Sequence, residues 1–596
     1  MHDNKLKSLR EDIAAAYLSD ELSCVNELRQ ILSQDSTLQS RIETTARKLI
    51  EKVRQEHNVS SALDAFLSEY DLSSEEGVLL MCLAESLLRI PDSETANRLI
   101  NEKLALADWE RHLGNHQSLL VNASTWGLLL TGQFVRFTNA EGYFSGLFNR
   151  LLQKAGEPIL RTALKEAMSI LVHQFVIGRN IDEAINIGER PIYQNYLFSF
   201  DILGEAAICA DDVARFFKEY AQAIERLAKE NGQPGSLLQS GGVSIKLSAL
   251  HPRMEILKRK RVMRELIPRV RFLVMQAMKG NVGITIDAEE TSRLDLTLDI
   301  FDQLFHDPAI NGWEGLGLAV QAYQKRAIKV INWLAELARQ ANTKIMIRLV
   351  KGAYWDNEIK FAQEAGLEDY PVFTQKVNTD ISYLACAYTI LQNSSCFSPQ
   401  FATHNAQTIA AVYEMSREYN VEIEFQRLFG MGSALYDEAT SPQGYAMPCR
   451  IYAPVGSHTH LLLYLVRRLL ENGANTSFVY RIADMNAPIE SLIESPVAKA
   501  EKRKIGKNSD IPVPPDLFGD SRKNSQGLEL VMDSLVRQLE AELNEYNSAL
   551  WTASAIINGE TLGSIEYSVF EPADCKKLVG YVVQPGIDAF KLAVQT

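Results

Sequence analysis

Polar side chains stand at the ends of eight short apolar segments in the middle of the chain. In order they are Asp201, Lys246, Asp287, Gln321, Arg348 with Lys351, His404, Gln426 and Tyr452. Any one of them alone is best explained as a loop residue or a satisfied core group. Because a buried charge is costly unless it is paired or used, that explanation is poor for the whole set. Carboxylates, cations, amides, an imidazole and a phenol at one place predict a ligand-binding site.

The cations fall into two sets. Arg348 and Lys351, near His404 and Asn405, suit the binding of phosphate groups. The second set is Lys246 with Arg467 and Arg468, which lie on a helix expected at 461–471. Adjacent arginines on a helix usually point to water, although Glu471 is spaced to pair with either one. The sequence shows no histidine pair with metal-ligand spacing and a supporting carboxylate, so no metal site is expected.

Eight strands would bring these residues together. Most of the apolar segments precede a plausible helix, which predicts parallel β/α units. Eight units suit an α/β fold of the (β/α)₈ TIM-like barrel type, whose strand ends form one rim. A doubly wound open sheet is the alternative, but its usual glycine-rich turn after an early strand is missing. The predicted strands are Leu197–Ile202, Val243–Leu247, Gly283–Ile286, Leu316–Val320, Lys344–Val350, Gln400–Thr403, Val421–Phe425 and Arg450–Ala453.

The flanks differ from this central region. Residues 1–57 are predicted to form a helical arm and residues 58–180 an all-α domain, which together precede a barrel at 181–485. A linker and a helix are expected at 486–550, followed by a strand-like tail at 551–596. A net charge of −14 disfavours nucleic acid and anionic lipid. Seven scattered cysteines and the lack of a bilayer-length apolar run are typical of a cytoplasmic protein.

Several motifs resemble the proline dehydrogenase domain of bacterial proline utilization A proteins. They are Ser244–Pro252, Ile286–Glu290, Gln321–Arg326, Ile347–Trp355, Phe401–Asn405 and Tyr464–Gly473. Leu72–Gly77 and Met81–Glu85 resemble the α-domain before that barrel, so the resemblance covers about residues 60–535. It implies oxidation of L-proline to Δ1-pyrroline-5-carboxylate with FAD, by hydride transfer to the flavin. It also implies electron transfer to ubiquinone or a similar quinone, with peripheral association with the inner membrane.

The resemblance also implies roles for single residues. Lys246, Arg467 and Arg468 would bind the proline carboxylate, and Asp287, Tyr354, Leu428 and Tyr452 would shape the substrate pocket. Asp201 and Glu205 match the family string Asp-x-Leu-Gly-Glu, and Glu205 would pair with Arg467 to gate access. Arg427 departs from the family pattern, since it puts a cation beside a flavin-contact position. The residues expected to hold FAD are Gln321, Arg348, Val350, Lys351, Gly352, Ala353, Trp355, Thr374, Thr403, His404, Asn405, Gln426, Arg468, Glu471, Ser477 and Phe478.

The two ends refine this interpretation. Some family members begin with a basic ribbon-helix-helix segment that binds DNA; residues 1–60 lack one, so no nucleic-acid binding is expected. Ile556–Glu560, Glu571–Ala573 and Val579–Val582 resemble the opening of the family's aldehyde dehydrogenase domain, so we expect a truncated chain that keeps only the first activity. A homo-oligomer is possible. The alternative functions are a Schiff-base lyase with Lys246 as nucleophile and a DNA-binding regulator.

Overall fold

A computed structural model describes residues 2–32, 35–56, 175–204, 206–230, 237–456, 478–483, 487–502, 506–528, 530, 533–547 and 549–596. The chain divides into two compact units, residues 1–528 and 529–596, which we describe separately. The α-domain expected at 58–180 lies almost wholly outside the described residues.

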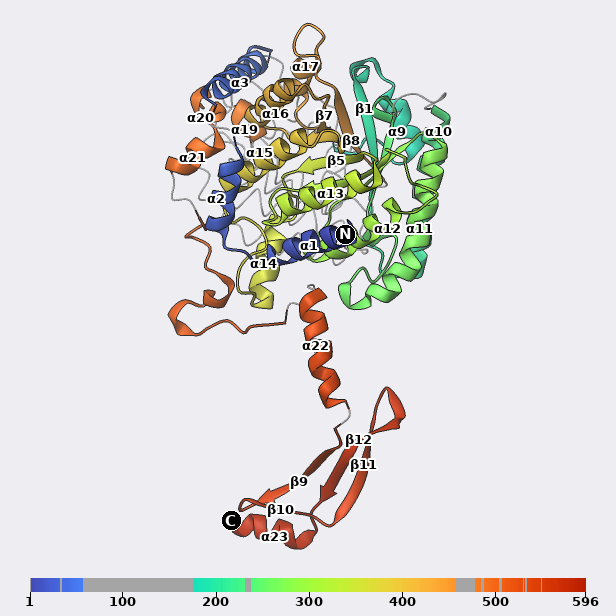
Figure 1. Ribbon diagram of the computed structural model, residues 1–596, viewed down its shortest axis with the longest axis vertical. Coiled ribbons are helices and arrows are strands. Elements are labelled where there is room, and N and C mark those ends of the chain that lie inside the picture. Colours follow the sequence, from blue (N-terminus) through green and yellow to red (C-terminus); the bar gives the residue numbers. More distant parts are fainter. Residues whose placement is uncertain are drawn as a thin grey trace, which may run out of the picture. The chain divides into compact units, whose positions relative to one another are not determined.

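Eight parallel strands close a barrel in chain order (Figure 1). Register is continuous around the ring, and β1 pairs with β8 over the full length of both strands. The closed ring confirms the predicted barrel and shows that the open-sheet alternative is wrong. The strands are β1 (Tyr196–Ile202), β2 (Gly242–Ile245), β3 (Gly283–Ile286), β4 (Leu316–Gln321), β5 (Ile345–Val350), β6 (Phe397–Ala402), β7 (Glu424–Leu428) and β8 (Cys449–Val455).

The sixth and seventh strands show the largest shifts from their predicted starts. β6 begins at Phe397 rather than Gln400, and β7 begins at Glu424 rather than Val421. Asn420 adopts the left-handed conformation that ends the preceding helix, and the Val421 N–H donates back to the carbonyl of Ser416. Asn420 and Val421 therefore form the C-terminal cap of α16 (Ala406–Tyr419), and β7 begins only after them.

Helices surround the barrel and cover the apolar outer faces of its strands (Figure 1). The interior-facing positions carry polar residues instead, such as Ser199 and Asp201 on β1, since successive side chains alternate between faces. The helix that follows β7, α17, is short. The barrel helices are α10 (Ala210–Glu230), α11 (Arg259–Lys279), α12 (Leu294–Phe305), α13 (Ala327–Ala341), α14 (Trp355–Ala365), α15 (Lys376–Gln392), α16 (Ala406–Tyr419) and α17 (Ser433–Thr440).

The N-terminal arm packs against this outer layer. Its helices are α1 (His2–Ala15), α2 (Glu21–Ile31) and α3 (Ser36–Glu56). α1 lies along α13, α2 contacts α15, and α3 contacts α16 and α17 (Figure 1). The short helices α19 (Phe478–Ala483), α20 (Ile489–Ile493) and α21 (Pro496–Lys502) follow the barrel.

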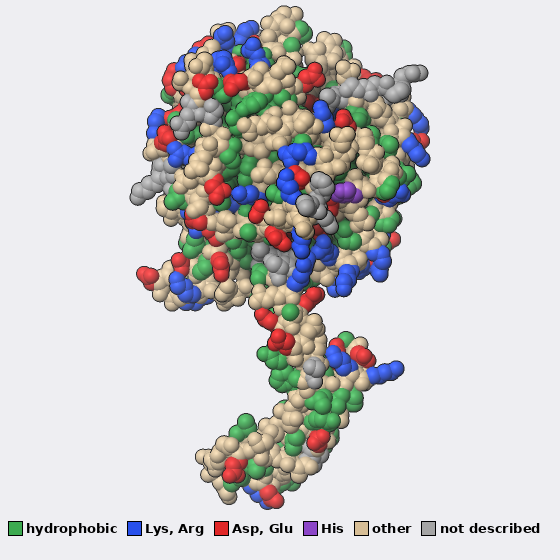
Figure 2. Space-filling view, in the orientation of Figure 1, with side chains coloured by type: hydrophobic (Ala, Val, Ile, Leu, Met, Phe, Trp, Pro, Cys, Tyr) green, Lys and Arg blue, Asp and Glu red, His purple; other side chains and the backbone are tan. Residues whose placement is uncertain are grey.

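The C-terminal unit is a helix followed by a four-stranded sheet, ordered β10-β9-β12-β11. The strands confirm the strand-like tail predicted after residue 550. Hydrophobic side chains are exposed on the face of this unit seen in Figure 2. None of the described helices of the chain is long and apolar enough to cross a membrane. The elements are α22 (Asp533–Tyr546), β9 (Trp551–Ile557), β10 (Glu560–Leu562), β11 (Ile565–Glu571), β12 (Asp574–Gln584) and α23 (Ile587–Gln595).

Candidate active site at the rim of the barrel

The carboxyl ends of β1, β2, β3 and β8 bring four predicted residues into direct contact. The ammonium group of Lys246 donates to Asp201 at 2.5 Å and lies 3.6 Å from a carboxylate oxygen of Asp287. The Tyr452 hydroxyl donates to the same Asp287 oxygen at 2.6 Å, and it lies 3.5 Å from the Lys246 nitrogen. The predicted convergence of these strand ends is therefore present.

The protonation states in this cluster follow from its burial and its charges. Burial works against the charged form of Lys246, but the carboxylates of Asp201 and Asp287 raise its pKa above the ordinary value. Burial and the same two carboxylates raise the pKa of Tyr452 well above its usual range. Lys246 is thus a cation and Tyr452 a neutral hydrogen-bond donor at physiological pH.

Arg348 lies inside the barrel below this cluster. Its guanidinium donates to Asp287 at 2.7 Å, to Ser244 at 2.9 Å and to Ser199 at 3.1 Å, and it lies 5.3 Å from the centre of the Tyr452 ring. Its Nε atom is buried without a hydrogen-bond partner among the described residues.

Arg348 and Lys351, grouped from the sequence as one phosphate-binding set, have different partners in the structure. The Lys351 ammonium group pairs with Asp380 on α15, whereas the Arg348 guanidinium is bound to Asp287, Ser199 and Ser244. Arg348 is an inward-facing position of β5, while Lys351 comes after the strand has ended. The two cations therefore serve different parts of the rim.

The segment after β5 leads directly into a helix terminus. α14 begins at Trp355, and its N-cap residue Tyr354 provides no side-chain cap. Gly352 has a φ of +139°, and an added Cβ would lie 2.4 Å from the Tyr323 ring, so only glycine fits there. The indole of Trp355 donates to the carbonyl of Phe373 at 2.8 Å. Lys351, Gly352 and Ala353 therefore lie at the entrance of a helix.

Three other predicted cofactor residues use their polar groups within the fold. The Asn405 side chain caps α16 by accepting from the N–H groups of Gln407 and Thr408. Gln321 donates to the carbonyl of Glu289 at 3.2 Å. Thr374 directs its N–H and its hydroxyl to Glu21 of the arm.

The ends of β6 and β7 are joined around His404. Its Nε2 accepts from the N–H of Leu428 at 3.1 Å, which ties the predicted pocket wall to a predicted cofactor residue. An added Cβ at Gly432 would lie 2.9 Å from the His404 ring. The Thr403 carbonyl accepts from the buried hydroxyl of Tyr436 at 2.8 Å. The side-chain oxygen of Gln426 is buried without a partner among the described residues.

Arg427 does not place a cation beside the cofactor residues, contrary to the expectation from the sequence. Gln426 faces the barrel interior, so its neighbour on β7 faces the helices. The Arg427 guanidinium lies 4.7 Å from the centre of the Tyr196 ring and donates to the carbonyl of Met431 at 3.1 Å. Arg427 thus stabilises the turn after β7 from the outer face of the barrel, through its hydrogen bond to Met431.

Some predicted residues cannot be placed in this site. Glu205, Arg467, Arg468, Glu471 and Ser477 lie outside the described residues. Phe478 begins α19 and is half-buried, and Val350 ends β5.

Four supporting residues were not predicted from the sequence. Ser199 and Ser244 hold Arg348, and the buried Tyr220 accepts from the N–H of Lys246 at 3.1 Å. The Glu289 carboxylate accepts from the N–H of Ser248 at 3.1 Å and from Arg293 at 2.5 Å. For the two serines a signal existed, because each lies two residues before a predicted site residue and therefore on the same strand face.

Comparisons with known proteins match three segments of the chain to family models. Residues 186–481 match the family model for proline dehydrogenase, and residues 7–54 match the proline utilization A proline dehydrogenase N-terminal domain. Residues 62–175 match a model described as the DNA-binding domain of proline dehydrogenase. That description stands against our expectation of no nucleic-acid binding, and the matched segment lies outside the described residues except at its last position.

Three relatives show how the match is distributed. The chain is 44% identical to bifunctional protein PutA of Escherichia coli, over 96% of this chain and 44% of that protein. A solved structure of a single-residue mutant of Bradyrhizobium japonicum proline utilization A shares 42% identity with a TM-score of 0.70, and covers 90% of this chain and 53% of that chain. Proline dehydrogenase 1 of Bacillus subtilis is 28% identical over 52% of this chain and 89% of that protein. The chain thus spans about half the length of the bifunctional relatives.

Proposed function

The chain carries the proline dehydrogenase domain of the proline utilization A family, and on this premise we propose that it oxidises L-proline to Δ1-pyrroline-5-carboxylate. FAD would take the hydride, and a membrane quinone would take the electrons. The observation that carries the proposal is the buried cluster of Lys246, Asp201, Asp287 and Tyr452 at the rim.

The residues beside this cluster fit a flavin nucleotide. The first N–H groups of α14, together with Lys351, which pairs with Asp380, would contact the phosphates. Gly352 leaves room for the Tyr323 ring and permits the positive φ with which the chain turns from β5 into α14. The buried side-chain oxygen of Gln426 and the buried Nε of Arg348 each lack a partner among the described residues, as expected where a polar ring belongs.

Substrate binding follows from the charges of the cluster. Lys246 and Arg348 balance the carboxylates of Asp201 and Asp287, so these four groups have no net charge. Arg467 and Arg468, carried over by resemblance, would add the positive charge that a substrate carboxylate needs. Lys246 would bind one carboxylate oxygen and fix the ring position, which turns binding energy into orientation. Because the raised pKa of Tyr452 keeps its hydroxyl protonated, this residue would not act as a base. Water would then accept the proton of the substrate amine.

The Schiff-base alternative conflicts with the state of Lys246. A nucleophilic lysine must lose its proton, but Asp201 and Asp287 raise the pKa of this one. Borohydride treatment in the presence of a carbonyl substrate is therefore expected to leave Lys246 unmodified. A trapped adduct on Lys246 would support the lyase instead.

The decisive experiment is anaerobic addition of L-proline to the purified protein. We expect a yellow protein whose flavin absorbance is bleached by L-proline and restored by a quinone analogue. A colourless protein that takes up no FAD would contradict the proposal.

DNA binding is a second candidate function, favoured only by the match of residues 62–175. An electrophoretic shift assay on promoter DNA at low and high salt tests it, since phosphate contacts are weakened by salt. We also propose that the protein is cytoplasmic and associates peripherally with the inner membrane, where it reaches its quinone.

A further inference from the structure

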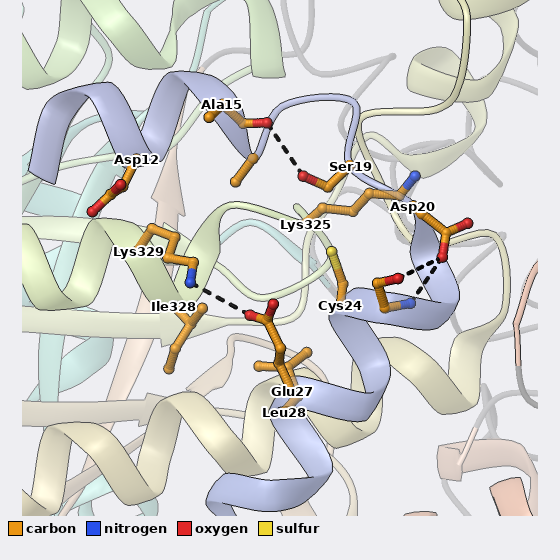
Figure 3. Close-up of a pocket in the computed structure, with 12 residues that line it drawn as sticks. Asp12, Ala15, Ser19, Asp20, Cys24, Glu27, Leu28, Lys325, Ile328 and Lys329 are labelled. Carbon is orange, nitrogen blue, oxygen red and sulfur yellow. Dashed lines mark hydrogen bonds and ion pairs between the residues drawn. The ribbon is translucent and has the colours of Figure 1, made fainter.

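Glu21 is a buried carboxylate in the N-terminal arm. It is the first residue of α2, and it is 0% exposed. Asp20 caps the same helix by accepting from the N–H and the hydroxyl of Ser23, which fixes the position of the helix start (Figure 3). The groove beside it, about 420 Å³ between α1, α2 and the start of α13, is lined by charges of both signs, including the pair of Glu27 and Lys329.

The partners of Glu21 belong to the barrel. Its two oxygens accept from the Thr374 N–H at 3.0 Å, and one of them accepts from the Thr374 hydroxyl at 2.8 Å. The Asn378 side chain, in the first turn of α15, donates to Glu21 at 2.6 Å. All of these donors are supplied by residues 374–378, so one carboxylate organises this short segment.

Residues beyond the barrel join the same network. The N–H of Asn508 donates to the Thr374 hydroxyl at 2.8 Å, and the carbonyl of Gly506 accepts from Asn378 at 3.0 Å. Three parts of the chain that are 353 and 134 residues apart thus meet at Thr374.

This segment also holds a predicted cofactor residue in place. The carbonyl of Phe373, next to Thr374, accepts from the indole of Trp355. Because the N–H and hydroxyl of Thr374 are engaged with Glu21, they are not the groups that would hold FAD. Thr374 then acts on the cofactor by fixing the backbone that orients Trp355.

A role in stability alone does not account for the choice of a carboxylate. A buried carboxylate is usually paired with a cation. Glu21 interacts electrostatically with Lys325, but the ammonium groups of Lys325 and Lys507 form their ion pairs with Asp369. All side-chain hydrogen bonds of Glu21 go to residues 374–378. If Glu21 served only to stabilise the arm, a well-packed apolar residue at this position would do so without the cost of burying a charge.

We propose that Glu21 is a positioning residue for the cofactor, so that docking of the arm sets how tightly FAD is held. This inference rests on the proposed function. Glu21 fixes the 373–378 segment, this segment fixes Trp355, and the entrance of α14 is thereby shaped before FAD binds. Loss of the carboxylate leaves three donors of Thr374 and Asn378 without their acceptor in the interior.

The test is FAD affinity of the full chain, measured by titrating apoprotein with FAD and following flavin fluorescence. For Glu21→Ala we expect the Kd for FAD to rise roughly 10- to 100-fold, the range that corresponds to leaving buried donors unsatisfied. The KM for proline at saturating FAD is expected to stay within about twofold, because the substrate cluster is untouched.

Glu27→Gln is the matched control. It removes a carboxylate from the same helix, where Glu27 pairs with Lys329 at the surface, and we expect the FAD Kd to stay within about twofold. Glu21→Gln keeps the side-chain volume and one acceptor oxygen, and its Kd should fall between those of the wild type and Glu21→Ala.

The outcomes separate the two proposals. If the wild-type protein fails to bind FAD, the proposed function is wrong. If the wild type binds FAD and a folded Glu21→Gln or Glu21→Ala variant binds it equally well, the positioning role is wrong. A lower melting temperature of the apoprotein with unchanged FAD Kd would also overturn it, because a purely structural residue behaves in that way.

Discussion

At the scale of single residues, the partners of Lys246 determine its protonation state and therefore its chemistry. On the sequence it is one lysine after an apolar segment, and the same residue type fits a Schiff-base nucleophile. The contacts with Asp201 and Asp287 change its chemistry, because they favour the charged form. Residue type predicted the site, but the choice between the two reactions needed the distances.

We predict that Lys246→Met lowers both stability and substrate binding. The variant leaves Asp201 and Asp287 with one cation fewer in a buried site, which should cost about 3 kcal/mol of the free energy of unfolding. Chemical denaturation measures this loss, and the KM for proline should rise strongly. In Lys246→Met with Asp201→Asn, part of the lost stability should return; strict additivity of the two changes would contradict the pairing.

Sequence periodicity located the inward-facing residues where a strand was correctly bounded. The same alternation explains why the Arg427 side chain faces the outer helices. From the sequence it is expected beside the cofactor, because it follows Gln426, a predicted flavin contact. The networks of Glu21 and Glu289 could not be predicted, because each joins segments whose proximity exists only after the barrel has closed.

At the scale of elements, α14 is fastened to the loop after β3 by one acidic side chain. Glu358 is buried, and it accepts from the Thr291 N–H at 2.8 Å and from the Thr291 hydroxyl at 2.6 Å. Burial raises the pKa of this carboxyl above its ordinary value, although both Thr291 contacts work against the rise. The contact between Glu358 of α14 and Thr291 therefore depends on pH.

We predict that Glu358→Gln removes this dependence. A raised pKa means that the folded state disfavours the ionised carboxylate, so its cost is present at neutral pH and disappears as the pH falls through the folded pKa towards about 4.5. The wild-type melting temperature should therefore rise relative to that of Glu358→Gln between about pH 7 and pH 5. A constant difference between the two proteins over this range would show that Glu358 does not titrate there.

At the scale of the whole molecule, the arm and the barrel form one unit through contacts between distant parts of the chain. Periodicity predicts that the arm is helical, but it says little about which surface receives it. Arg10 on α1 donates to Asp299 at 2.9 Å, and its guanidinium lies 5.5 Å from the centre of the Trp333 ring on α13. Lys5 reaches Glu336 at 2.7 Å from a more exposed position on the same helix.

We predict that Arg10→Ala loosens the arm, whereas Lys5→Ala does not. Arg10 is largely buried and combines an ion pair with an aromatic contact, so its loss should cost about 1–2 kcal/mol locally. The exposed ion pair of Lys5 should contribute well under about 1 kcal/mol. Limited proteolysis measures the difference, since local opening exposes the backbone around residues 16–20 to cleavage. Arg10→Ala should be cut there several times faster than either the wild type or Lys5→Ala. Equal rates in all three proteins would mean that the apolar faces of α1 and α13, and not Arg10, hold the arm in place.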